Sequence, residues 1–137
     1  MPARVPFDYL VVRVVPRVDR DEFVNAGVVL HAPSRAFLGA AIALPAARLA
    51  ALAPDVDLAA VARHLDGIRA VCAGDPGAGP IARLTPSERF HWLSAPRSTV
   101  IQPSPTHTGL CEEPAAALVE LFQRTVGPLP ASGAASP

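Results

Sequence analysis

Residues 97–109 concentrate side chains that could bind a ligand or transfer a proton. Arg97 could hold a carboxylate or a phosphate group with two parallel hydrogen bonds, and Ser98 adds a hydroxyl group beside it. Gln102 could donate and accept hydrogen bonds, and His107 could titrate near neutral pH as an acid or a base. The same side chains could instead satisfy backbone carbonyl groups in this proline-containing stretch. These four residues are therefore candidate binding residues, and the structural alternative stays open.

A second polar group surrounds residues 22–31. Glu22 and Asn25 could belong to a binding site, or they could bond to turn amides where a strand begins. The two-residue period of a strand predicts Asn25, Gly27 and His31 on one side and Glu22 on the other. Gly27 lies inside the strand pattern, which indicates a bulge or a close approach by another segment.

Motifs of the common enzyme and cofactor classes are missing from the sequence. Residues 74–80 contain three glycines but lack both the Gly-Lys-Ser/Thr ending of a P-loop and the spacing of a dinucleotide-binding turn. The serines between residues 87 and 104 do not stand in a Gly-x-Ser-x-Gly nucleophile elbow. His107 and Cys111 are four residues apart, but Gly109 between them argues against the helix that a shared metal would need. We therefore expect no cofactor and no metal ion, and the catalytic residues are unknown.

Apolar patterning predicts the elements that would position these residues. Three strands are predicted at Phe7–Val18, Glu22–His31 and Arg35–Leu44, arranged as an antiparallel meander. In the first strand, alternation separates an apolar face from a wetter one: Leu10, Val12 and Val14 on the former, and Tyr9, Val11, Arg13 and Val15 on the latter. Thr99–Gln102 is predicted as a fourth strand, and the prolines after it predict an extended segment.

Helices are predicted between and after these strands. Ala46–Leu52 favours a helix by propensity, and Asp55 or Asp57 can cap the next one. The apolar residues of that second helix form one stripe, expected to lie on the sheet: Leu58, Val61, Leu65, Ile68 and Cys72. Ser87–Leu93 fits either a short helix or a short strand, and the last helix is predicted to begin near Glu112–Pro114.

Together these elements predict an α+β fold, with an antiparallel sheet of about four strands and two to four helices packed on one face. Residues 1–126 are expected to form a single domain, and the low apolar content of residues 127–137 predicts a disordered tail. Phe90 and Trp92 are expected in the core, because aromatic residues are few. Cys72 is expected to be an inert, buried thiol.

Length and charge narrow the class of protein further. The 137 residues are the usual size of one domain, and 12 basic residues balance 12 acidic ones. We therefore expect neither general nucleic-acid binding nor attraction to anionic lipid. The apolar runs are far shorter than the roughly 20 residues of a membrane span. Two cysteines and an N-terminus unlike a signal peptide predict a cytoplasmic protein.

Two stretches of the sequence resemble one bacterial protein family. The first reads Glu-Phe-Val-Asn-Ala-Gly-Val-Val-Leu over residues 22–30. The second is a series of spaced residues: Phe90, Trp92, Arg97, Ser98, Gln102, His107, Gly109, Leu110 and Cys111. Both are similar to the bacterial domain-of-unknown-function family 3037, and the resemblance extends from about Tyr9 to Val126. The family has no assigned reaction. Its members are often encoded beside a HipA-like serine/threonine kinase, so the resemblance implies that kinase as a partner.

Two functional hypotheses follow, and whether the chain is an enzyme is left open. The first is a non-enzymatic accessory or interaction module that binds a partner protein, with the HipA-like kinase as the partner that the resemblance implies. It would bind through the wetter sheet face or the segment of residues 97–109. The alternative is a small hydrolase or nuclease-like enzyme whose polar residues converge on one pocket. That pocket would be formed by Glu22, Asn25, Arg97, Gln102 and His107.

Overall fold

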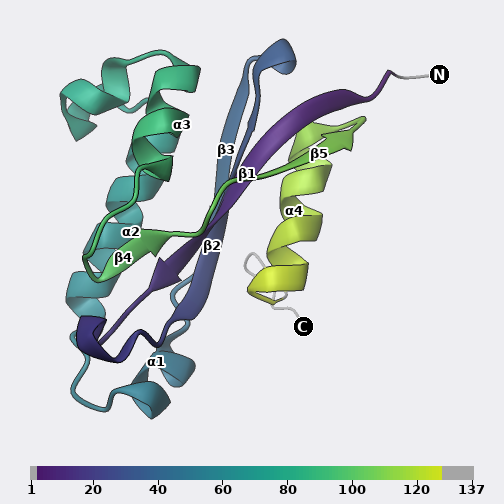
Figure 1. Cartoon of the computed structure of the whole chain (residues 1–137). Coiled ribbons are helices and arrows are strands. Elements are labelled where there is room, and N and C mark those ends of the chain that lie inside the picture. The colour runs from purple at the N-terminus through teal and green to yellow at the C-terminus, as the bar shows by residue number, and fades with distance from the viewer. Residues whose placement is uncertain (1–2, 128–137) are drawn as a thin grey trace, which may run out of the picture.

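The computed structural model describes residues 3–127, which form five strands and four helices (Figure 1). The strands are β1 (Val5–Val14), β2 (Val24–Ala32), β3 (Phe37–Ile42), β4 (Ile101–Pro103) and β5 (His107–Cys111). The helices are α1 (Ala46–Leu52), α2 (Leu58–Ala73), α3 (Pro86–Ser94) and α4 (Pro114–Thr125). All but the first residue of the tail predicted at 127–137 lies outside the described residues.

The five strands form one antiparallel sheet in the order β3-β2-β1-β4, with β5 also paired to β1. The predicted meander of the first three strands is confirmed, and β4 lies close to its predicted position. A fifth strand, β5, follows where an extended segment was expected. Prolines cannot donate to a sheet ladder, but Pro103 and Pro105 fall at the end of β4 and between the strands, so pairing resumes after them.

A β-bulge in β2 changes which side chains share a face. Val12 pairs with Gly27 and Arg13 pairs with Asn25, so Ala26 has no partner on β1. The extra residue moves Asn25 to the opposite face from His31, and the prediction that these two face the same way is wrong. The bulge suggested by Gly27 is confirmed, and so is the close approach. A Cβ atom on Gly27 would lie 2.8 Å from the carbonyl oxygen of Ala41 on β3.

Helices cover both faces of the sheet, whereas the sequence predicted helices on one face (Figure 1). On one face, Leu10, Val12 and Val29 pack with residues of α2 and α3 such as Leu65. On the other face, α4 packs against strand residues of β1 and β2: Phe7, Val28, Leu30 and Ala32 meet Leu118 and Phe122. Since residues 28–32 of β2 are buried on both sides, their continuous apolar run reflects a two-sided core.

Local capping explains where the helices begin. Asp57 caps α2 by accepting a hydrogen bond from the amide of Ala60 at 3.0 Å. Thr85 and Glu88 form a capping box at the start of α3, which makes residues 86–94 a helix rather than a strand. Cys72 of α2 is buried as predicted, and burial raises its pKa to about 12, so its thiol stays protonated at neutral pH. Within residues 3–127, no helix has the length and apolar composition to span a bilayer.

Candidate functional site

A groove runs along the surface between α2, α3 and the segment leading into β4. Its volume is about 830 Å³, which is in the range of small-ligand and peptide sites. Residues of α2 form one wall, and Trp92, Arg97 and residues 99–101 form the other. We call this surface the α2–α3 groove.

Trp92 is the most prominent side chain of the α2–α3 groove. Trp92 is 39% exposed, so the prediction that it lies in the core is wrong. Helix α3 turns Phe90 and Leu93 toward the sheet, and Trp92 therefore points away from it. The Arg97 guanidinium carbon lies 4.7 Å from the centre of the Trp92 ring, and its Nη2 donates to the Trp92 carbonyl oxygen at 2.7 Å. A cation–π contact and one hydrogen bond thus link Arg97 to Trp92.

Two arginines and two aspartates line the α2–α3 groove, so their formal charges balance. Asp66 forms an ion pair with Arg69, and Asp75 accepts a hydrogen bond from the amide of Gly77 at 2.9 Å. Arg63 and Arg97 form no ion pair with the described residues. Both guanidinium groups are therefore available to an acidic group of a ligand or partner.

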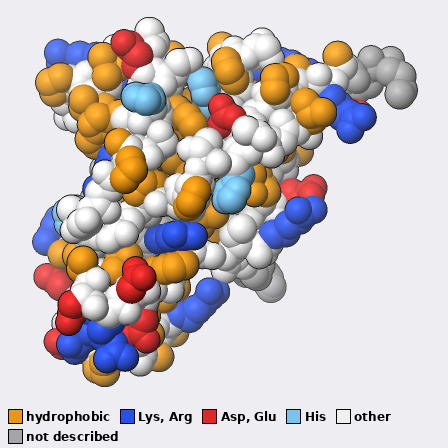
Figure 2. All heavy atoms as spheres, in the orientation of Figure 1, with side chains coloured by type: hydrophobic (Ala, Val, Ile, Leu, Met, Phe, Trp, Pro, Cys, Tyr) orange, Lys and Arg blue, Asp and Glu red, His pale blue; other side chains and the backbone are white. Residues whose placement is uncertain are grey.

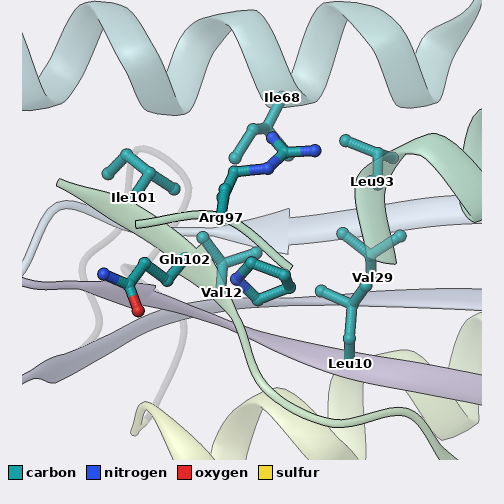
Figure 3. Close-up of a pocket in the computed structure, with 9 residues that line it drawn as sticks. Leu10, Val12, Val29, Ile68, Leu93, Arg97, Ile101 and Gln102 are labelled. Atoms are coloured by element: carbon teal, nitrogen blue, oxygen red, sulfur yellow. The ribbon is translucent and has the colours of Figure 1, made fainter. Parts of the chain in front are cut away.

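A second, much smaller hollow lies beneath Arg97 (Figure 3). Its walls are mostly apolar, and they come from β1, β2, α2 and α3: Leu10, Val12, Val29, Ile68 and Leu93. The volume of about 10 Å³ is that of roughly one water molecule. Figure 3 shows Arg97 reaching toward Ile68 while the Gln102 amide extends away from the hollow. This hollow is a gap in the core and has no room for a substrate.

The other residues singled out in the sequence are dispersed. Glu22 pairs with Arg20 at 2.7 Å on the exposed surface, and this pairing lowers the pKa of the Glu22 carboxyl group. Figure 1 places the turn between β1 and β2 at the lower end of the molecule, and charged side chains of both signs gather at that end (Figure 2). His107 is exposed and its ring centre lies 5.2 Å from that of Tyr9, and Ser98 is exposed in the loop before β4.

The structure does not assemble the pocket expected for an enzyme. Arg97 lies on the face of the sheet covered by α2 and α3. Asn25 lies on the opposite face, where its Nδ2 donates to the Thr125 carbonyl oxygen of α4 at 3.0 Å. The sheet therefore separates two of the five side chains on which the hydrolase or nuclease hypothesis depends. Within the described residues, no three His, Cys, Asp or Glu side chains lie close enough to share a metal ion.

Two of the predicted residues, Asn25 and Gln102, lie in one row across the sheet, on either side of Arg13. Arg13 of β1 pairs with Asn25 on one side and with Gln102 on the other, so the three side chains share one face. Its guanidinium carbon lies 4.1 Å above the centre of the Phe23 ring. We call Gln102, Arg13 and Asn25 the sheet-face row.

Comparison with known protein families gives a match over most of the chain. The family model described as a protein of unknown function (DUF3037) matches residues 9–126. The chain belongs to this family. The match covers most of β1, all the other strands and all four helices, and it confirms the resemblance seen in the sequence. Neither the curated proteins nor the solved structures contain a match.

Two features were missed in the sequence. Trp92 was not recognised as a surface residue, and Arg13 was not recognised as a candidate site residue. Arg13 had a detectable signal, because it is a cation inside an otherwise apolar strand and on its wetter face. Trp92 had none, because the direction of α3 relative to the sheet decides its exposure.

His31 is a buried side chain rather than part of an open site. It is 6% exposed, its ring stacks on Phe90 with centres 5.3 Å apart, and its Nε2 lies 3.3 Å from the Ser87 hydroxyl oxygen. Burial lowers the pKa of His31, and the neighbouring Asp8 carboxylate partly offsets that effect.

We expect His31 to make the protein less stable as the pH falls. With its pKa lowered in the folded state, the unfolded chain binds a proton first, from about pH 6.5 downward. The free energy of unfolding should therefore decrease with falling pH in this range. Urea denaturation between about pH 5 and 7 would measure this slope, which His31→Gln should reduce. An equal slope in His31→Gln and wild type would contradict the prediction.

Proposed function

We propose that this chain is a non-enzymatic interaction module that binds a partner protein in the α2–α3 groove. The observation that carries the proposal is the exposed Trp92 held by Arg97. Tryptophan and arginine are the residue types that contribute most binding energy in protein interfaces. Because these contacts already restrict the two side chains, the conformational entropy lost on binding would be smaller.

The chemistry of the groove favours an apolar segment with an acidic side chain as its occupant. The Trp92 ring and the neighbouring Val100 and Ile101 offer apolar surface. Arg63 and Arg97 offer two cations that are not paired within the described residues. An acidic group placed between them would form charge-assisted hydrogen bonds.

The HipA-like serine/threonine kinase is the partner that we propose. The chain belongs to the family, and the partner is the one that the resemblance in the sequence implies. We propose the cytoplasm as the compartment, in line with the two free cysteines at Cys72 and Cys111.

Calorimetric titration of the chain with a HipA-like kinase tests this proposal. We expect a complex with a dissociation constant in the micromolar range or tighter. Trp92→Ala should weaken it by at least about tenfold, because truncating such an anchor typically costs 2 kcal/mol or more. Arg97→Ala should weaken the complex in the same direction.

Val119→Ala is the matched control for Trp92→Ala. Val119 is 38% exposed on α4, on the other side of the sheet, so its truncation should leave the affinity unchanged. Absence of a complex at micromolar concentrations would contradict the proposed partner. Equal affinities of the Trp92→Ala and Val119→Ala variants would contradict the proposed groove.

A further inference from the structure

Arg13 contains a buried polar atom whose role in the fold is unexplained. Its Nε is buried and has no hydrogen-bond partner among the residues that the structure describes. Leaving a buried donor without a partner costs about 1–3 kcal/mol, and more when the donor is charged. Such an atom calls for a partner, which can be an ordered water molecule or a group of a bound ligand.

The surroundings of Arg13 hold its guanidinium group in place without neutralising it. The Phe23 ring lies beneath it at 4.1 Å, and this contact favours a cation with its plane against the ring. Arg13 forms no ion pair with an acidic side chain in residues 3–127. The charge is thus presented on the sheet face with its hydrogen-bonding capacity unused.

The two neighbours of Arg13 in the sheet-face row add neutral donors. Asn25 Nδ2 donates one hydrogen to Thr125, and Gln102 Nε2 donates one to the carbonyl oxygen of Thr99 at 2.9 Å. A carboxamide has two N–H groups, so each side chain keeps a second donor. Directly paired residues in an antiparallel sheet have Cβ atoms about 4.5–5.5 Å apart, so each carboxamide is a direct neighbour of Arg13, with Asn25 on one side and Gln102 on the other.

We propose that the sheet-face row binds a carboxylate group. A single guanidinium fork matches the two oxygens of a carboxylate, and the Arg13 Nε would gain the hydrogen bond that it lacks. One cation flanked by two neutral amides balances a single negative charge, whereas a phosphate dianion would keep an uncompensated charge. The carboxylate belongs either to a free small acid or to a protein side chain or C-terminus.

This site is independent of the proposed function. The α2–α3 groove lies on the face covered by α2 and α3, and the sheet-face row lies on the face that carries α4. A substitution in one should leave the other intact. Trp92→Ala therefore serves as a control for the row, and failure of one proposal would not entail failure of the other.

Nuclear magnetic resonance of the full chain tests this site directly, because the Nε–H signal of an arginine is observable. With acetate as the probe, the Arg13 Nε–H signal and the amide signals of Asn25 and Gln102 should shift together and saturate. Arg13→Gln should weaken acetate binding by at least about tenfold, as expected for loss of a charged hydrogen-bonding partner. Arg17→Gln, which alters an exposed arginine paired with Asp55, should leave it unchanged.

Further arms of the experiment identify the source of the carboxylate and test the alternative anion. Saturable shifts with acetate would support a small acid. Shifts only with a peptide that has a free C-terminus, and not with its amidated form, would support a protein carboxylate.

Arg13→Lys keeps the positive charge but loses the two parallel N–H donors of the guanidinium group, so it should bind acetate several-fold more weakly than wild type. The proposal is overturned if none of the three signals saturates at tens of millimolar acetate or peptide. Tighter binding of inorganic phosphate than of acetate at equal ionic strength would also overturn it.

Discussion

Replacing Phe122 with alanine is expected to lower the free energy of unfolding by about 3–5 kcal/mol. Phe122 lies between α4 and the sheet, and it is the largest fully buried side chain in residues 3–127. Its removal leaves a cavity among Val28, Leu30 and Leu118, and small domains have only about 5–15 kcal/mol of stability in total. Urea denaturation followed by circular dichroism would measure the loss.

The matched control lies on the same helix. Val119 is exposed on α4, and Val119→Ala should change the free energy of unfolding by no more than about 0.5 kcal/mol. If Phe122→Ala cost less than about 1 kcal/mol, α4 would not be part of the core, contrary to the two-sided packing.

Gly27 and Gly67 are expected to respond to alanine in opposite directions. A Cβ atom at Gly27 would lie 2.8 Å from both the Ala41 carbonyl oxygen and Ile42 Cγ1. The oxygen belongs to the backbone of β3, so the strands would have to separate, at a cost of about 1–3 kcal/mol. At Gly67 in α2 an added Cβ meets nothing within 4 Å, and alanine should stabilise the helix by about 0.5–1 kcal/mol.

Thermal and urea unfolding of the two variants would measure this contrast. A lower melting temperature for Gly27→Ala together with a higher one for Gly67→Ala supports both the bulge and the close approach of β3. A neutral or stabilising Gly27→Ala would mean that β2 and β3 are farther apart than described.

Elements that depend on local sequence were predictable. Helix α1 has the predicted bounds, α2 begins after one of the two predicted caps, and α4 begins at Pro114 as expected. Propensity, capping and periodicity act within a few residues, so one sequence contains the information. The meander of β1, β2 and β3 was predictable for the same reason, because short turns join its strands.

Features that depend on distant pairing were not predictable. The partner of β5 is β1, about a hundred residues earlier, and nothing in residues 107–111 identifies it. The bulge at Ala26 exists only in relation to the register with β1, yet it decides that Asn25 and His31 face opposite sides. The candidate site was affected most, because a convergent pocket requires several such long-range relations to hold at once.

Fluorine NMR of the chain labelled with 5-fluorotryptophan tests the proposed groove most directly. Trp92 is the single tryptophan, so the spectrum has one signal that reports on this side chain alone. In the free chain the exposed ring should give a large solvent isotope shift when D₂O replaces H₂O. We predict that this isotope shift disappears when the unlabelled HipA-like kinase is bound at saturation. An unchanged isotope shift in a complex whose formation calorimetry has established would show that the partner binds elsewhere.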